Sequence, residues 1–359
     1  MTLLFTPYKI GSLSIPNRLI RSATAERMAS ENGTPQPALI ELYRKLAAGG
    51  VGLIITGHFY IQPNGKAHPE MTGVYSDDLI PGLTLLSEAV HQEGGLIAAQ
   101  INHGGMNASA WHDPIAPSEI QLPSMEHPAR EMTINEIEET IRNFGQAARR
   151  VKEAGFDGVQ IHSAHGYLIS EFLSPLTNRR TDHWGGDFDR RLNFLREVYA
   201  SVRQNVGPDF PVLVKLGMED FPENGLSAAD GALIASSLEA MGMDAIEISS
   251  GIGKPGVGSI HKGVRTEAEE AYFRPLAKLA RQTTKLPLSL VGGMRSRAVM
   301  ESILSSGDAD FISICRPLIR EPNFPNMLKA GVIERSACLS ANNCWAINAG
   351  DGIACKCPR

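Results

Sequence analysis

The sequence lacks both an excess of basic residues and an apolar run long enough to cross a bilayer. Its formal charge is -5 at pH 7, which disfavours nucleic acid or an anionic membrane as the main partner, since both bind basic surfaces. The N-terminal stretch MTLLFTPYKIGSLSIPNR also lacks the basic start and the apolar core of a signal peptide. We therefore expect a cytoplasmic protein with small-molecule partners, and we leave a homo-oligomer open.

Cysteine is absent from the chain before Cys315. The other four cysteines, Cys338, Cys344, Cys355 and Cys357, lie within the last 22 residues. In a cytoplasmic chain, such clustering favours metal binding or redox chemistry over a structural disulfide.

Short runs rich in Ile, Leu and Val alternate with longer amphipathic segments along the chain. The near-continuous apolarity of the short runs is typical of parallel strands that are covered on both faces. Eight strands are predicted, at Arg18–Thr24, Gly52–His58, Leu96–Asn102, Gly158–His162, Val212–Gly217, Ala245–Ser249, Leu288–Gly292 and Phe311–Cys315. Strand followed by helix about eight times predicts an α/β protein with a single (β/α)8 barrel. A doubly wound sheet is the alternative, but it usually has fewer strands.

The helical period is clearest at Ile134–Gly155, Ala228–Gly242 and Arg297–Gly307. Two regions interrupt the alternation: a polar insertion at residues 103–133, after the third strand, and a tail at residues 330–359. Long excursions of this kind are usually functional or mobile in a compact barrel. We therefore divide the chain into a barrel, residues 1–329, and a C-terminal tail, residues 330–359.

The stretch HSAHGYLISEFLSPLTNRRTDHWGG, residues 162–186, follows the fourth predicted strand. It places His162, His165 and Tyr167 at the carboxyl end of a barrel strand, where enzymes of this fold carry their chemistry. A zinc site needs three or four convergent ligands, and His-x-x-His supplies only two of them. A polar loop that merely bonds itself would explain a lone histidine, but it explains three such groups at one strand end less well.

Further polar or flexible residues follow the other strands and would share the same mouth. They are Gln100, Lys215, Ser249, Ser250, Gly251, Gly292, Gly293, Cys315 and Arg316. A glycine turn that opens a helix presents backbone N–H groups to an anion, and Arg316 adds a positive charge. Simple turns would explain the glycines well but Arg316 less well. Because the loops after strands seven and eight usually bind phosphate in this fold, we predict a phosphate-bearing cofactor there.

These motifs resemble those of the old yellow enzyme family of FMN-dependent oxidoreductases, from Leu4 to about Leu328. The most specific segment is residues 162–186 followed by DFDRR, and NRLIRSAT, GLIITGH, AAQINHGG, LVGGM and ICRPLI support it. The resemblance implies an FMN-binding barrel that takes hydride from NADH or NADPH. The implied reaction is reduction of the activated C=C bond of an α,β-unsaturated carbonyl compound.

The resemblance also implies roles for single residues. His162 and His165 would bind the carbonyl oxygen of the substrate and stabilise the negative charge that develops on it. Tyr167 would deliver a proton to the α-carbon as general acid. Gln100 would bind the pyrimidine edge of the flavin, and Lys215 would place a cation beside it. The remaining expected cofactor contacts are Ala23, Thr24, Gly57, Ser250, Gly292, Gly293, Cys315 and Arg316.

Four positions depart from the family pattern. Lys215 stands where arginine is usual, which keeps the charge but loses the planar fork, so the flavin potential is expected to shift. Ala23 replaces a proline, Ala25 replaces a threonine or cysteine beside the flavin, and Cys315 replaces a glycine. None of these changes removes a group needed for hydride or proton transfer.

The cysteine tail is similar to a [4Fe–4S] motif, near C-x2-C-x2-C-x12-C, of relatives such as dienoyl-CoA reductase. Cys338, Cys344 and Cys357 are in register with it, but Ala341 stands where the second ligand is expected. Cluster ligation normally takes four thiolates, and Cys355 lies on the wrong side of the motif to replace the missing one. We therefore expect a degenerate motif without a cluster.

Two alternatives to the ene-reductase interpretation stay open. One is an FMN-dependent amine dehydrogenase or demethylase that runs in the oxidative direction, whose relatives often replace the histidine pair. The other is a non-catalytic FMN-binding electron carrier with a vestigial site. The presence of His162, His165 and Tyr167 disfavours both.

Overall fold

Eight parallel strands form a closed barrel in chain order, with the last strand paired to the first. The structure is a computed structural model that describes residues 2–121, 125, 128–252, 258–345 and 351–358. The barrel strands are β3 (Leu19–Arg21), β4 (Leu53–Tyr60), β5 (Ile97–Asn102), β8 (Gly158–Ser163), β9 (Val212–Gly217), β10 (Ala245–Ser249), β11 (Leu288–Leu290) and β12 (Phe311–Ile314). The predicted (β/α)8 barrel is confirmed.

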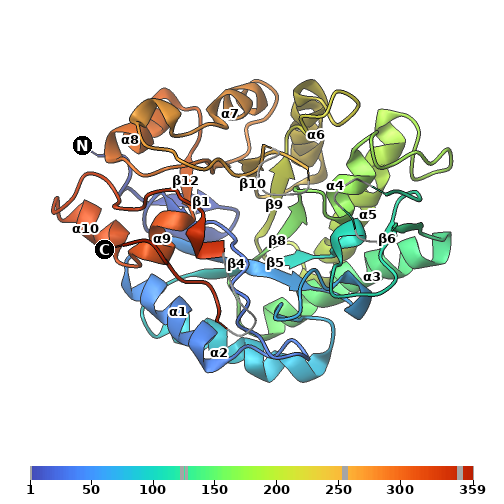
Figure 1. Cartoon of the computed structure of the whole chain (residues 1–359), viewed down its shortest axis with the longest axis horizontal. Helices are drawn as coiled ribbons and strands as arrows, with labels where there is room; N and C mark the ends of the chain where they lie inside the picture. The colour runs from blue at the N-terminus through green and yellow to red at the C-terminus, as the bar shows by residue number, and fades with distance from the viewer. Residues whose placement is uncertain (1, 122–124, 126–127, 253–257, 346–350, 359) are drawn as a thin grey trace.

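Helices surround the barrel and follow one another round it (Figure 1). They are α1 (Pro37–Ala48), α2 (Ile80–His91), α3 (Ile134–Glu153), α4 (Leu168–Leu173), α5 (Phe188–Val206), α6 (Ala228–Met241), α7 (Arg274–Arg281), α8 (Arg297–Ser306), α9 (Arg316–Arg320) and α10 (Phe324–Lys329). The three helices with the clearest period, α3, α6 and α8, end slightly before their predicted ends. Their terminal glycines, Gly155, Gly242 and Gly307, adopt positive φ, which stops a helix and which glycine tolerates best.

Three strand ends at the mouth of the barrel differ from the prediction by two residues or more. One of them is the end of β11, which stops at Leu290 instead of Gly292. Strand β3 stops at Arg21, because the chain then leaves the ladder to line a cavity. Strand β4 continues past His58 to Tyr60, pairing with β5 after a register shift between Ile55 and His58. A register shift of this kind re-aims side chains near a strand end.

A short hairpin that was not predicted lies at the amino end of the barrel. It consists of β1 (Tyr8–Ile10) and β2 (Leu13–Ile15), paired antiparallel. Ile10 and Ile15 are fully buried in an apolar cluster with residues of the barrel strands, among them Ile20 and Phe311. The hairpin therefore closes this end of the barrel with hydrocarbon.

The predicted insertion after β5 folds over the opposite, carboxyl end. It contains η3 (Gly105–Asn107) and two short parallel strands, β6 (Ile115–Ala116) and β7 (Arg130–Glu131). Met106, Ala116 and Ile120 form a small apolar cluster with Ile252, which follows β10. Four further 3-10 turns are η1 (Pro63–Gly65), η2 (Asp77–Leu79), η4 (Glu267–Glu269) and η5 (Asn343–Trp345). Within the described ranges, no helix combines the length and apolarity needed to span a membrane.

The tail after α10 runs along the carboxyl end of the barrel instead of leaving it. The Ser336 N–H donates to Arg295 O at 3.0 Å, and the Ile353 N–H donates to Glu26 O at 2.8 Å. Ser340 accepts a hydrogen bond on its carbonyl from the Gly263 N–H at 2.8 Å. The tail thus contacts loops that follow three different barrel strands.

Candidate active site

A cavity of about 510 Å3 opens at the carboxyl ends of the barrel strands. Its volume lies within the range of about 300–1,000 Å3 that is usual for small-molecule sites. Ten of the predicted site residues line it: Ala23, Thr24, Gln100, His162, His165, Tyr167, Lys215, Gly293, Cys315 and Arg316. The structure therefore brings together residues that lie almost 300 positions apart in the sequence.

Three residues predicted to contact the cofactor do not line the cavity. A Cβ on Gly57 would lie 2.5 Å from Thr24 O, so Gly57 packs behind the backbone of Thr24. The Ser250 hydroxyl turns away and donates to Glu219 O at 2.6 Å. Gly292 lies against the backbone of Phe273, which a Cβ would meet at 3.3 Å.

The floor of the cavity is a hydrogen-bonded network of buried polar side chains. Gln100 donates to Gln160 Oε1 at 2.7 Å, and Gln160 donates to Glu247 Oε2 at 3.0 Å. The other carboxylate oxygen of Glu247 accepts a hydrogen bond from Ser22 at 2.6 Å. Lys215 Nζ lies 3.2 Å from Glu247 Oε2 and donates to Ser22 Oγ at 2.8 Å.

This network neutralises the predicted flavin-binding cation. Burial alone would raise the pKa of Glu247, but the Lys215 ammonium and the hydrogen bonds from Ser22 and Gln160 lower it below its ordinary value. Glu247 is therefore an anion that holds Lys215 in place. Sequence reasoning missed Glu247, although a carboxylate inside the buried run AIEIS was a signal.

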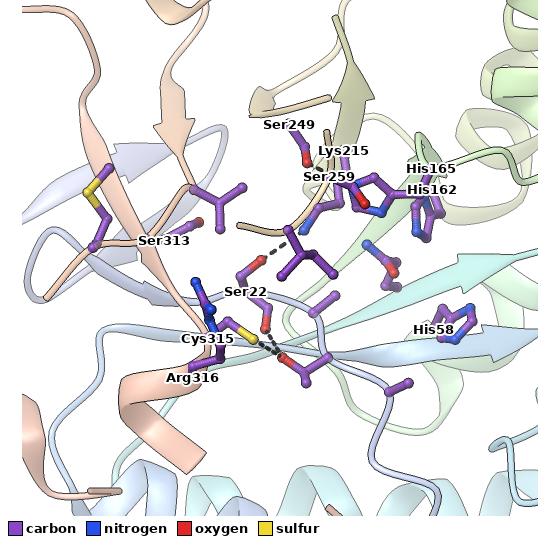
Figure 2. A pocket seen from close by; sticks show the side chains of 18 of the residues that line it. Ser22, His58, His162, His165, Lys215, Ser249, Ser259, Ser313, Cys315 and Arg316 are labelled. Atoms are coloured by element: carbon purple, nitrogen blue, oxygen red, sulfur yellow. Dashed lines mark hydrogen bonds between the residues drawn. The ribbon is translucent and has the colours of Figure 1, made fainter. Parts of the chain in front are cut away.

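Three imidazoles and one phenol form one wall of the cavity. The ring of Tyr167 lies 4.9 Å from the ring of His162 and 5.1 Å from that of His58, between centroids. The rings of His162 and His165 are 5.3 Å apart. Figure 2 shows His58, His162 and His165 on one side of the cavity, with Cys315 and Arg316 on the opposite side.

His165 has an unusual backbone conformation and a fixed ring. Its φ is +64°, a left-handed value that costs a non-glycine residue about 1 kcal/mol or more. Its Nε2 lies 2.7 Å from Ser249 Oγ, which fixes the ring orientation (Figure 2). Nδ1 of the neighbouring His162 is buried and has no hydrogen-bond partner within the described part of the chain. A buried polar atom of this kind is costly unless a ligand satisfies it.

The protonation states of this wall suit hydrogen-bond donation by neutral groups. Burial lowers the pKa of His165 to about 3 and that of His58 to about 4, and it lowers the pKa of His162 well below its ordinary value. Burial also raises the pKa of Tyr167 to about 12. The imidazoles are therefore neutral at pH 7, and the phenol keeps its proton.

His58 is a second residue that sequence reasoning left out of the site. It ended a predicted strand, so the rule that strand ends carry chemistry was available to find it. The register shift in β4 precedes it, and its Nδ1 lies 2.9 Å from the amide nitrogen of Asn102. Its ring contacts Tyr167 and lines the cavity beside it.

The predicted phosphate end has a different construction from the one expected. The backbone N–H groups of Arg295 and Ser296, at the start of α8, both donate to Glu270 Oε2 at 2.8 Å. This helix start is therefore already occupied by an anion of the chain itself. Gly293 precedes it with a φ of +75°, and a Cβ there would meet the ring of Tyr272 at 3.0 Å.

Arg316 lines the cavity but is also tied to the tail. Its Nη1 donates to Asn342 Oδ1 at 2.7 Å and to the carbonyl oxygens of His261 and Ser340, at 2.8 and 3.4 Å. Ser340 itself lines the cavity. The tail thus completes this end of the site, which the sequence did not indicate.

The cysteines are not arranged as a metal centre in the described part of the chain. The structure describes all five cysteines, and no group of three or more His, Cys, Asp or Glu side chains there is placed to hold a metal ion. Cys315 Sγ lies 3.0 Å from Thr24 Oγ1, at the cavity wall. That the cysteine motif of the tail is degenerate and holds no cluster stays a prediction.

Comparisons with known proteins agree with this geometry. The sequence model of the NADH:flavin oxidoreductase / NADH oxidase family matches residues 3–334. The chain is 36% identical over 350 residues to an NADH oxidase from Thermoanaerobacter brockii, covering 94% of this chain but only 52% of that protein. It is 36% identical over 322 residues to an NADPH dehydrogenase from Bacillus subtilis, covering 89% and 92% of the two chains. An old yellow enzyme homologue from Zymomonas mobilis superposes with a TM-score of 0.79 at 27% identity, covering 93% and 94%.

The fold, the cavity and these matches together place the chain in a class of barrel proteins, the flavin oxidoreductase type. More narrowly, the chain belongs to the NADH:flavin oxidoreductase / NADH oxidase family, the family of the old yellow enzymes. The chain spans about half the length of the Thermoanaerobacter relative, at 52%.

Proposed function

We propose that the protein binds FMN in this cavity and uses NADH or NADPH to reduce the activated C=C bond of an α,β-unsaturated carbonyl compound. The observation that carries the proposal is the histidine wall. It presents two neutral imidazoles, one with a buried unpartnered nitrogen, next to a phenol that keeps its proton.

The residues on the floor and at the opposite end fit the cofactor. Gln100 and Lys215 would hold the flavin ring, and Gly293 and Arg316 would hold its phosphate. Gly293 lines the cavity with a φ of +75°, a conformation that glycine tolerates best, so its backbone can lie directly against a ligand. When bound, FMN would supply the hydride chemistry that no side chain of the cavity can perform.

His162 and His165 would bind the carbonyl oxygen of the substrate. As neutral donors they place hydrogen bonds where negative charge develops during reduction, without first being desolvated themselves. The Ser249 hydroxyl and the strained backbone hold the His165 ring in one orientation. Such preorganisation keeps the stabilisation available when the charge forms.

Tyr167 would supply the proton at the α-carbon. Because its pKa is raised to about 12, the phenol is protonated across the whole neutral range. Its ring lies 4.9 Å from the ring of His162, so a substrate whose oxygen binds the histidine pair places its next carbon atoms beside the phenol.

The proposal is tested by the absorption spectrum of the purified protein under anaerobic conditions. We expect a flavin spectrum that NADH or NADPH bleaches and that 2-cyclohexenone then restores. A protein that cannot be loaded with FMN would overturn the cofactor assignment. A flavin that is bleached but not restored by enones would favour an electron carrier, and bleaching by an amine would favour the oxidative alternative.

A further inference from the structure

Arg27 is a cation of the cavity that the proposed reaction does not use. It lines the cavity with a φ of +53°, a left-handed value that is rare for an arginine. Among the ion pairs of the described residues, none involves Arg27. An unpaired guanidinium in a cavity attracts an anion.

The chain on both sides of Arg27 is fixed, so its conformation is imposed. The preceding residue, Glu26, is buried and accepts the Ile353 N–H on its carbonyl at 2.8 Å. The following residue, Met28, accepts the Gln36 N–H on its carbonyl at 3.1 Å. A strained residue that is held by its neighbours is commonly part of a site.

The neighbouring carboxylate is not available to Arg27. Glu26 points the other way, where its Oε1 lies 2.6 Å from Arg21 Nη2 and accepts the Tyr43 hydroxyl at 2.6 Å. Both of these partners are buried. The carboxylate of Glu26 is therefore paired away from the cavity, while the guanidinium of the next residue, Arg27, lines it.

Arg27 lines the same cavity as Tyr167 and His58. The charge of Arg27 acts on Tyr167 and His58, and that of Lys215 acts on His58, His162 and His165, so Tyr167 is the member of the wall that Arg27 alone affects. Lys215 is neutralised by Glu247, whereas no carboxylate among the described residues pairs with Arg27.

We infer that the substrate carries a carboxylate or another anionic group, and that Arg27 binds this group while the carbonyl oxygen lies on the histidine pair. The inference rests on the proposed function and narrows its substrate class to anionic enones. The same chemistry exists in the 2′-phosphate of NADPH, so the experiment must separate these two sources of negative charge.

Binding is tested first, with FMN-loaded protein and two matched phenols that differ in charge. The phenol oxygen of 4-hydroxybenzoate or 4-hydroxybenzamide mimics the substrate oxygen, and the flavin spectrum reports binding. We expect the wild type to prefer the carboxylate, and Arg27→Gln to lower that preference about tenfold or more, since a charge-assisted hydrogen bond is lost. Arg27→Lys should retain part of it, because the charge remains.

Lys66→Gln is the matched control. Lys66 is a cation that does not line the cavity. Its Nζ donates to Glu31 O at 2.5 Å. Its loss should leave the preference for 4-hydroxybenzoate unchanged. Equal weakening of both phenols in Arg27→Gln, or the same loss of preference in Lys66→Gln, would overturn the inference.

Turnover is tested with (E)-4-oxopent-2-enoate and its methyl ester, which differ in charge but share the enone. For each protein we take the ratio of the flavin reoxidation rate with the acid to that with the ester. Comparing this acid-to-ester ratio between wild type and Arg27→Gln cancels the difference in intrinsic reactivity of the two compounds. We expect this ratio to fall about tenfold or more in Arg27→Gln. An unchanged ratio contradicts the inference.

The reductive half-reaction identifies the source of the anion. If Arg27→Gln slows flavin reduction by NADPH but not by NADH and leaves the acid-to-ester ratio unchanged, Arg27 binds the nucleotide and the substrate inference is wrong. If neither enone reoxidises the flavin in the wild type, the proposed function fails. The phenol titration then still decides whether Arg27 binds a carboxylate.

Discussion

The two ends of the barrel interior bury opposite kinds of side chain. The amino end holds an apolar cluster that includes Ile10, Ile15 and Phe311, each fully buried. The carboxyl end buries Lys215 and Glu247, together with imidazoles that include an unpartnered nitrogen. Burying charges and unsatisfied polar atoms costs stability, whereas burying hydrocarbon supplies it. The comparison shows that one end stabilises the fold while the other keeps polar groups ready for a ligand.

Tyr167→Phe should have the largest effect, and it should fall on chemistry alone. Removing the proposed proton donor is expected to slow reoxidation of the reduced flavin by 2-cyclohexenone about 10²–10⁴-fold, the usual contribution of a general acid. Stopped-flow absorbance measures this step and the preceding reduction by NADPH separately. An equal loss in both steps would contradict the proton-donor role.

Ile15→Ala should have the converse effect at the other end. Ile15 is fully buried in the amino-end cluster, so truncation should lower the free energy of unfolding by about 2–5 kcal/mol. Urea unfolding measures the loss, and the flavin spectrum of the folded variant should be unchanged. Ser14→Ala, at the exposed neighbouring position, is the control. A cost below about 1 kcal/mol would show that the hairpin does not contribute to the core.

The histidine wall should make the cofactor-free protein sensitive to acid. The pKa of His58 is lowered from 6.5 to about 4, so the unfolded chain binds the proton more readily than the folded one. Stability should therefore fall as the pH decreases from about 6.5 to about 4, by about 3 kcal/mol for this residue. His58→Asn should remove that part of the loss in unfolding titrations, whereas His112→Asn, at an exposed position, should not.

Arg316→Ala should weaken cofactor binding with a smaller energetic effect. If Arg316 holds the phosphate, its loss should reduce FMN affinity about tenfold or more, which the flavin-to-protein absorbance ratio after dialysis measures. Since Arg316 Nη1 also donates to Asn342, the Asn342→Ala variant tests whether the tail contact alone produces the loss. A fully loaded Arg316→Ala protein would remove the phosphate assignment.

Glu171→Gln should have the smallest effect, and the size of the effect should depend on pH. Glu171 is fully buried, and burial raises its pKa well above 4.5, although the Met106 N–H donates to it. The unfolded chain therefore loses this proton first, and the wild type loses stability as the pH rises above about 4.5. The Glu171→Gln variant should be as stable as the wild type at pH 4.5. At pH 8 it should be more stable than the wild type by about 1 kcal/mol. Unfolding titrations at the two pH values measure the difference.

Some of the fold was not predictable from local patterns. The hairpin β1–β2 has strands of three residues each, which are too short to show a period. The end of β4 depended on a register shift, which the sequence does not mark. The start of α8 was expected to be free for a phosphate, but Glu270, which lies well before it in the chain, takes its N–H groups.

The sequence by itself determined the barrel and the order of its strands, because apolar runs and helical periods are local properties. It therefore also determined that His162, His165, Tyr167, Gln100 and Lys215 share one mouth. Only the tertiary structure decided which charges are paired there. Glu247 lies opposite Lys215 because β9 and β10 pair in that register, while Arg27 keeps no such partner in the described part of the chain. Pairing depends on distances between segments far apart in the sequence, and no local pattern contains those distances.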